Sequence, residues 1–158
     1  MDRPDHLGQP VTTISVVSAP DVDDLTGLRH ALWPHGSVAE YRAEVVAALA
    51  SGKGLALIAR DNHDRAVGFA EASIRHDYVN GCDTSPVAFL EGIYVDPRHR
   101  RTGLARRLVE EVEAWARRQG YRELASDATM DNSVSHAMHN ALGFAETRRV
   151  VFFRKVLG

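Results

Sequence analysis

A single change of hydrophobic period, at Asp96-Pro97, constrains the fold more than any other feature of the sequence. Residues 87–95 form a nearly continuous apolar run of the kind found in buried strands. After Asp96-Pro97, apolar residues recur at helical spacing, arginine and glutamate fill the opposite face, and Gly120 closes the segment. The apolar positions are Leu104, Leu108, Val112 and Trp115. The sequence therefore predicts a buried strand that leads through a basic turn into an amphipathic helix.

The patterns on either side of this unit predict a mixed α/β (α+β) fold. β-like runs cover residues 11–17, 54–60, 66–76, 87–95 and 122–127, and a β-rich stretch extends to Val156. Helices are expected after Pro20-Asp21, after Ser37 and after Asn132, with Gly52 and Gly143 ending the last two. The expected order is β-α-α-β-β-β-α-β-α-β-β, with an antiparallel meander at its centre.

Length and charge limit the domain count and the partners. With 158 residues, 44% of them apolar, the chain suits one domain over residues 11–158 behind a flexible tail at 1–10. A formal charge of −2 gives no electrostatic reason to expect nucleic acid. No segment reaches the roughly 18 apolar residues of a membrane span, so no membrane association is expected.

Cysteine usage favours a reducing compartment. Cys82 is the only cysteine, so neither an intramolecular disulfide nor a Cys-rich zinc site can form, and a cytoplasmic setting fits. No base at a recognisable spacing marks Cys82 as an activated thiol, which argues against a covalent acetyl-cysteine. His136 and His139 stand three residues apart without further ligands, and we expect no metal.

The basic turn before the amphipathic helix is a candidate phosphate site. A helix N-terminus carries unpaired N–H donors and partial positive charge, so it can hold a pyrophosphate. Gly103 and Ala105 leave room for the backbone to approach, and Arg98, Arg100 and Arg101 add positive charge. The alternative is a solvated basic loop that precedes an ordinary helix.

The segment Arg100-x-x-Gly103-x-Ala105 resembles the Q/R-x-x-G-x-G/A acyl-CoA motif of the GNAT superfamily, and the resemblance extends from Ile14 to Lys155. It implies an acetyl-CoA N-acyltransferase fold: a central mixed, mostly antiparallel sheet splayed between its fourth and fifth strands. Gly92 is the expected bulge residue in the strand that would pair with pantetheine, since glycine relieves the backbone constraint. The residues that the resemblance assigns to acetyl-CoA are Ile93, Tyr94, Val95, Arg100, Arg101, Thr102, Gly103, Leu104, Ala105 and Arg106.

The stretch from Asn132 to Phe144 is similar to a second GNAT signature, an Asn that opens a helix ending in Leu-Gly-Phe. The resemblance implies that Asn132 binds pantetheine, although Asn also caps helices well and can do both. Many members carry a Tyr five residues before the Phe, where it protonates the CoA thiolate. Here His139 holds that position, and imidazole can donate a proton near neutral pH. A packed side chain is the alternative.

Two carboxylates are candidates for the acceptor side. Glu91 interrupts an apolar run, and a charge there is costly unless it is paired or lines a wet cleft. Asp127 ends the next strand, so both could flank the splayed gap and bind an ammonium group. We assign proton relay to Glu91 and amine binding to Asp127; an ion pair with an arginine is the alternative for each.

Residues 68–83 and 89–92 resemble one subgroup of aminoglycoside 6'-N-acetyltransferases, as do Leu32-Trp33-Pro34 and Ser126-Asp127. This resemblance implies transfer of acetyl from acetyl-CoA to the 6'-amine of an aminoglycoside by direct attack, and a homodimer. It adds Trp33 and Tyr78 to Glu91 and Asp127 as substrate-binding candidates. Trp33 could instead staple two helices, and Tyr78 could be a solvated turn residue.

Two other functions remain open from the sequence. One is a GNAT enzyme for another amine, such as a polyamine, a metabolite or a peptide terminus. The other is a noncatalytic acyl-CoA-binding module, which would keep the basic turn but have no need for Glu91 and Asp127. The β-rich stretch at 148–156 is the expected contact between two chains, because an exposed strand edge invites a partner.

Overall fold

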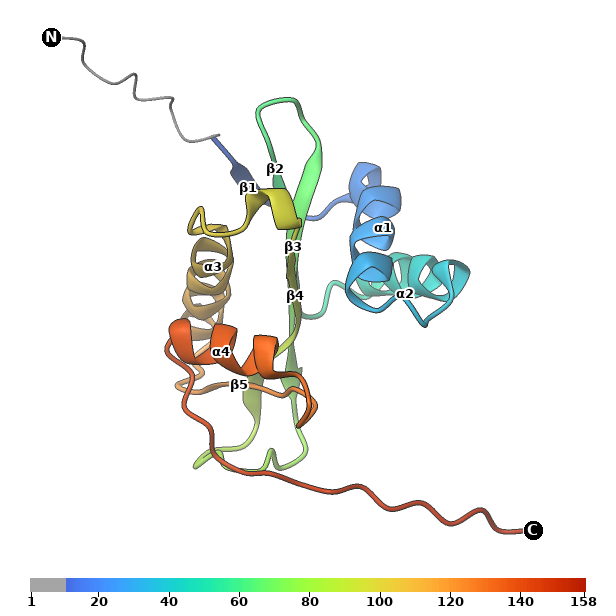
Figure 1. Ribbon diagram of the computed structural model, residues 1–158, viewed down its shortest axis with the longest axis vertical. Helices are drawn as coiled ribbons and strands as arrows, with labels where there is room; N and C mark the ends of the chain where they lie inside the picture. Colours follow the sequence, from blue (N-terminus) through green and yellow to red (C-terminus); the bar gives the residue numbers. More distant parts are fainter. Residues whose placement is uncertain (1–10) are drawn as a thin grey trace, which may run out of the picture.

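The computed structural model describes residues 11–158, so the tail expected over residues 1–10 lies outside the described residues. Its centre is a five-stranded sheet in the order β1-β2-β3-β4-β5 (Figure 1). The first four strands are antiparallel neighbours, and β5 runs parallel to β4. The expected mixed, mostly antiparallel sheet is confirmed. The strands are β1 (Thr13–Val16), β2 (Leu55–Arg60), β3 (Ala66–Arg75), β4 (Val87–Val95) and β5 (Leu124–Ser126).

Helices cover both faces of this sheet, α1 and α2 on one and α3 and α4 on the other (Figure 1). They are α1 (Val22–Leu32), α2 (Val38–Ser51), α3 (Leu104–Arg118) and α4 (Ser133–Ala141), and two 3-10 turns, η1 (Ala19–Asp21) and η2 (Pro97–His99), precede α1 and α3. Ser37 caps α2 by accepting a hydrogen bond from the Glu40 N–H, as its spacing predicts. No helix in the described part of the chain is long and apolar enough to cross a membrane.

The core lies in two clusters, one on each face of the sheet. On one face, Leu104, Leu108 and Val112 of α3 are fully buried against β2, β3 and β4, which confirms the predicted amphipathic helix. On the other face, Leu25 of α1 and Val45 of α2 pack with side chains of β2 and β3. The sheet is thus packed between two apolar layers, one on each face.

β4 is irregular at the point where the sequence predicts a bulge. Glu71 of β3 pairs with Gly92, and the next residue, Ala72, pairs with Leu90, so Glu91 is the extra residue of the bulge. A Cβ on Gly92 would come within 2.6 Å of the Trp33 ring, so only glycine lets Trp33 lie against this strand. The bulge therefore places Glu91 next to the residue on which the Trp33 ring packs.

β4 and β5 pair over only three residues, from Ala88↔Leu124 to Leu90↔Ser126. Beyond Leu90, β4 has no strand partner on that side within residues 11–158. Its backbone from Glu91 to Tyr94 is therefore unpaired on the β5 side, whereas the Val95 carbonyl accepts a hydrogen bond from Arg100 Nε. The predicted splay between the fourth and fifth strands is confirmed.

The prediction of two final strands is wrong for the single chain. No strand follows α4 in the described residues. The C-terminal segment, residues 145–158, passes the loop between β3 and β4, where Thr147 lies against Gly81, and then extends away from the body (Figure 1). Phe152 and Phe153 are 91% and 93% exposed. A strand needs a neighbour for its backbone hydrogen bonds, and this segment does not reach the free edge of β5.

Candidate functional site

The turn before α3 presents a cluster of free backbone donors. Gly103, at φ +80°, is the N-cap of α3 and has no capping side chain; the first helical bond runs from the Arg107 N–H to the Gly103 carbonyl, 3.1 Å. The N–H groups of residues 104–106 have no acceptor within residues 11–158. A Cβ on Gly103 would meet nothing within 4 Å, so the space beside this N-cap is open. This arrangement suits an anion.

Two of the predicted phosphate arginines anchor the turn to its neighbours. Arg100 Nε donates to the Val95 carbonyl, 3.0 Å, and Arg106 Nη2 donates to the Ala141 carbonyl at the end of α4, 2.6 Å. Arg101 is exposed at φ +61°, and the Thr102 hydroxyl donates to the His99 carbonyl, 2.6 Å. The turn is thus tied to β4 and α4 while Arg101 stays accessible.

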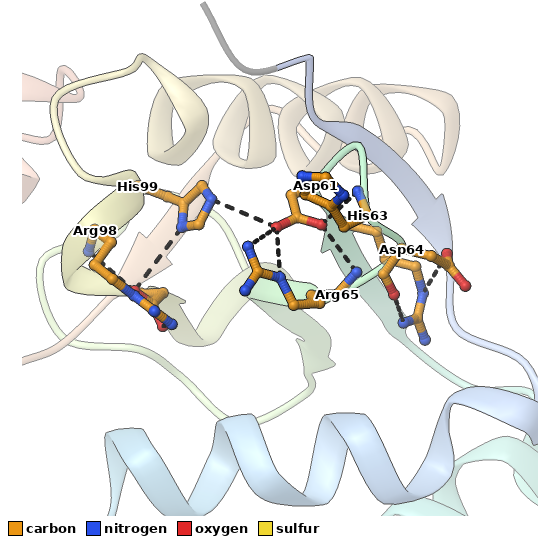
Figure 2. A network of polar contacts seen from close by, with 8 residues as sticks. Asp61, His63, Asp64, Arg65, Arg98 and His99 are labelled. Atoms are coloured by element: carbon orange, nitrogen blue, oxygen red, sulfur yellow. Dashed lines mark hydrogen bonds and ion pairs between the residues drawn. The ribbon is translucent and has the colours of Figure 1, made fainter.

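A network that the sequence analysis missed supports this turn from the β2–β3 hairpin (Figure 2). Asp61 Oδ1 accepts from the His63 N–H, 2.9 Å, and the Arg65 N–H, 3.0 Å, and Oδ2 accepts from Arg65 Nε, 3.0 Å. The buried His99 of η2 lies between carboxylates, with Nε2 3.9 Å from Asp61 and Nδ1 3.8 Å from Asp96. No local pattern points to this contact, because it joins a hairpin to a distant turn.

Replacing Asp61 with Asn is expected to flatten the acid dependence of stability. Burial raises the pKa of Asp61, but the hydrogen bonds from Arg65 and His63 outweigh it and lower the pKa from 3.8 to about 2. Because the folded value is depressed, this stabilisation is present above pH 3.8 and is lost as the pH falls towards 2. Urea unfolding at pH 7, 4 and 2.5 measures it: the variant should lose stability at pH 7 and show a smaller drop between pH 4 and 2.5. An unchanged drop would contradict the role given to Asp61.

An acidic cavity of about 1050 Å³ lies on the α1–α2 side of the bulge. Residues of α1, α2, β2, β3, β4 and the end of α3 line it, and of the predicted acceptor residues it includes Trp33 and Glu91. Three carboxylates stand in its lining against two fixed cations. The carboxylates are Glu44, Glu71 and Glu91, and the cations are Arg29 and Lys53. All three carboxylates are paired with arginines, Glu44 and Glu71 with Arg29 and Glu91 with Arg75, which lies outside the lining. The lining itself therefore carries one carboxylate more than it has cations, which suits a cationic guest.

Glu91 is held by an ion pair on β3. Arg75 donates to both carboxylate oxygens, Nε–Oε1 3.0 Å and Nη2–Oε2 2.7 Å, and the Ser73 hydroxyl also donates to Oε1. Partial burial raises the pKa of Glu91, but the hydrogen bonds from Arg75 and Ser73 and the charge of Arg75 outweigh it and leave the pKa below its ordinary value. The carboxylate is therefore charged at neutral pH and is a weak proton acceptor.

Asp127 and Tyr78 are both exposed and do not line the cavity. Asp127 still acts on the same group as Glu91: the hydrogen bond to Glu91 raises the pKa of Arg75, with smaller contributions from the charges of Glu91 and Asp127. Tyr78 lies in the loop between β3 and β4, where 63% of it is exposed. The charges of Glu91 and Asp127 thus both act on Arg75, but only Glu91 contacts it, and Tyr78 lies outside the cavity lining.

Trp33 forms part of the cavity wall. Its ring packs edge-on against Phe69, 6.2 Å between centroids, and its carbonyl accepts a hydrogen bond from the Tyr41 hydroxyl, 2.9 Å. Next to it, Arg29 binds Glu71 through two nitrogens and Glu44 through a third, at 2.7 to 3.0 Å. Neither residue was predicted from the sequence. Arg29 belongs to no motif, and Glu71 lies in the 68–83 stretch, where the resemblance assigned it no role.

Asn132 and His139 lie on α4 beside β5. Asn132 caps α4 by accepting from the Ser135 N–H, 3.1 Å, so its capping role is present. His139 Nδ1 lies 2.7 Å from the Ser135 carbonyl, and Nε2 lies 2.8 Å from the Ser126 hydroxyl. The Phe144 ring packs edge-on against the imidazole, 5.2 Å between centroids. His139 is thus fixed beside the last paired residue of β5.

Burial and the charges of Glu123 and Asp83 raise the pKa of Cys82, which disfavours a thiolate nucleophile. In residues 11–158 no group of three His, Cys, Asp or Glu side chains is placed to hold a metal ion. His136 Nε2 is engaged by the Thr129 carbonyl, 2.9 Å.

Comparison with known proteins places this geometry in one family. The model of the acetyltransferase (GNAT) family matches residues 21–144. A Serratia marcescens aminoglycoside N(6')-acetyltransferase type 1 is 54% identical over 138 residues, which is 87% of this chain and 94% of the relative. An aminoglycoside N(6')-acetyltransferase type 1 from Acinetobacter genomosp. 13 is 52% identical over 92% of this chain and 99% of its own length.

Solved structures agree with these relatives. The aminoglycoside antibiotic 6'-N-acetyltransferase AAC(6')-Ih from Acinetobacter baumannii superposes with a TM-score of 0.87 at 46% identity, covering 94% of this chain and 100% of its own. AAC(6')-Iy, solved in complex with the bisubstrate analog CoA-S-monomethyl-acetylneamine, superposes with a TM-score of 0.86 at 43% identity, covering 93% of this chain and 99% of its own.

Proposed function

This chain belongs to the acetyltransferase (GNAT) family, and we propose that it transfers the acetyl group of acetyl-CoA to the 6'-amine of aminoglycoside antibiotics and so confers resistance to them. The observation that carries the proposal is the acidic cavity at the bulge of β4, beside a strand edge left open by the splay. Such a cavity can hold a polycationic sugar next to the strand that receives the acyl donor.

The residues present fit acetyl-CoA on the other side of β4. The free N–H groups at the start of α3 and the exposed Arg101 suit its pyrophosphate. The backbone of residues 91–94, which has no strand partner on the β5 side, suits the amides of its pantetheine arm. Ile93, Tyr94, Val95 and the turn from Arg100 to Arg106 are therefore our proposed binding residues, with Asn132 at the start of α4.

The reaction needs a neutral amine nitrogen. An alkylammonium has a pKa near that of lysine, about 10.4, so it must lose a proton before it attacks. We assign Glu91 and Asp127 to binding the ammonium group, whose proton leaves through water. Because Glu91 is charged and already hydrogen-bonded, it orients the amine and does not itself remove the proton. A main-chain N–H near Ile93 stabilises the developing oxyanion, and His139 supplies the proton for the departing thiolate.

A panel of amines separates this proposal from its two rivals. CoA release is measured with aminoglycosides, polyamines, small metabolite amines and a peptide N-terminus at matched concentrations. We expect aminoglycosides to give the highest kcat/KM by a wide margin. A polyamine or peptide that exceeds them would assign the chain to another amine, and tight CoA binding with no turnover on any amine would support the noncatalytic module.

We further propose a homodimer in the cytoplasm, formed through residues 145–158. These residues have no strand partner in their own chain, and their apolar side chains are exposed while the outer edge of β5 is free. Exchange of this segment between two copies would add strands beside β5 on both, completing the expected order. The single cysteine is compatible with a reducing compartment.

Replacing both Phe152 and Phe153 with Ser is expected to convert the dimer to a monomer, because it removes the largest exposed apolar groups of the segment. Sedimentation equilibrium measures the mass. Val38→Ser, which alters an exposed apolar residue on α2, is the control and should leave the dimer intact. A monomeric unmodified chain at micromolar concentration would contradict the dimer.

A further inference from the structure

Ser126 occupies the last paired position of the splay. Its backbone is opposite Leu90, immediately before the bulge residue Glu91, and from there β4 and β5 diverge. The hydroxyl is half-buried and lies 3.3 Å from the Leu90 carbonyl oxygen and 2.8 Å from His139 Nε2. Ser126 is thus the side chain that joins the imidazole of α4 to the point where the sheet opens.

The proton positions around His139 follow from its partners. The Ser135 carbonyl, 2.7 Å from Nδ1, can only accept a hydrogen bond, so Nδ1 carries a proton. In the neutral ring Nε2 then accepts from the Ser126 hydroxyl. In the protonated ring Nε2 donates to Ser126 Oγ instead, and the hydroxyl proton is free to point at the Leu90 carbonyl or at a ligand in the splay.

We propose that Ser126 is a catalytic residue of the acetyl transfer and relays a proton from His139 to the departing sulfur. This inference rests on the proposed function and names the atom that the sulfur meets. As the amine nitrogen bonds to the thioester carbonyl carbon, the carbon–sulfur bond breaks and its electron pair goes to sulfur. The sulfur takes the hydroxyl proton of Ser126, and Ser126 Oγ takes the Nε2 proton of His139.

The relay closes without any further reagent. His139 is left neutral, with its Nδ1 proton still donated to the Ser135 carbonyl, and the proton that the amine released to solvent restores its charge. The edge-on Phe144 ring and the two serine contacts hold the imidazole in this orientation throughout. The proton of His139 therefore reaches the sulfur through the Ser126 hydroxyl, so the imidazole does not need to contact the substrate.

The test compares Ser126→Ala with Ser126→Thr in single turnovers, so that product release does not mask the chemical step. Loss of a positioned acid should slow acetyl transfer by about 100-fold in Ser126→Ala, whereas Ser126→Thr keeps the hydroxyl and stays within a few-fold of the unmodified chain. His139→Asn should cost a similar factor. Because the two residues act in series, the double variant should be no slower than either single one.

Two further readouts separate the relay from a structural role. The selenoester analogue of acetyl-CoA has a leaving group that needs no proton, so the defect of Ser126→Ala should largely disappear with it. The dissociation constant for CoA, measured by calorimetry, should not change. The relay would be overturned if Ser126→Ala lost as much activity with the selenoester as with the thioester, or if the effects of the single variants were additive. A weakened affinity for CoA would also overturn it. An unmodified chain that acetylates no amine would instead overturn the proposed function.

Discussion

Glu91→Gln is expected to lower kcat/KM for an aminoglycoside by about 100-fold, which corresponds to roughly 2.7 kcal/mol. Gln keeps the shape of the side chain but removes the charge that faces the cavity and holds Arg75. The variant would leave the Arg75 guanidinium unpaired beside a cationic substrate, and losing one partner of a hydrogen-bonded charge pair costs about 2 kcal/mol or more. Steady-state kinetics against acceptor concentration measures the effect.

Glu113→Gln is the matched control, because Glu113 pairs with Arg117 on the surface of α3 away from the cavity. It should change kcat/KM by less than about twofold, as exposed pairs contribute little. The pH profile adds a second check. Since the pKa of Glu91 lies below its ordinary value, acceptor binding should not weaken as the pH falls to 5. Normal acceptor kinetics in Glu91→Gln would remove Glu91 from the site.

Gly103→Val is expected to raise the KM for acetyl-CoA by about tenfold or more, because a branched side chain would stand in front of the free N–H donors at the start of α3. The residue also has φ +80°, where a β-branched side chain costs roughly 1–2 kcal/mol of stability. The variant should still fold, since its Cβ meets no neighbouring atom within 4 Å. Initial rates against acetyl-CoA, together with thermal unfolding, measure both effects.

Gly120→Val separates the two causes. Gly120 follows α3, has φ +88° and is equally free of neighbours, so it carries the same backbone strain at the other end of the helix. It should lose comparable stability with an unchanged KM for acetyl-CoA. If both variants raise this KM equally, the turn at Gly103 has no special part in binding the cosubstrate.

Local sequence patterns were sufficient to predict the strand and the helix that form the proposed acetyl-CoA site. The apolar run predicts the bounds of β4 without error, and helical spacing gives α3 and its buried face. Gly103 is recognisable because a glycine at a helix start beside arginines combines conformational freedom with charge. Each of these signals depends on residues close together in the chain.

Long-range pairing explains what the sequence could not give. No role was predicted for Arg75, Arg29 or Glu71, although two of them lie in the 68–83 stretch. Their contacts depend on how α1 crosses the sheet and on the bulge in β4. The prediction of the last two strands was wrong for a related reason. Residues 145–158 have β propensity but no strand partner within the described chain. Propensity alone does not form a strand whose hydrogen-bonding partner lies elsewhere.

Transfer to the 6'-amine is tested most directly by CoA release from acetyl-CoA with an aminoglycoside that carries a 6'-amine, beside its counterpart with a 6'-hydroxyl. We expect strong turnover with the amine, a product acetylated at the 6' nitrogen, and near-background release with the hydroxyl compound. Equal turnover on both compounds, or none on either, would contradict transfer to the 6'-amine.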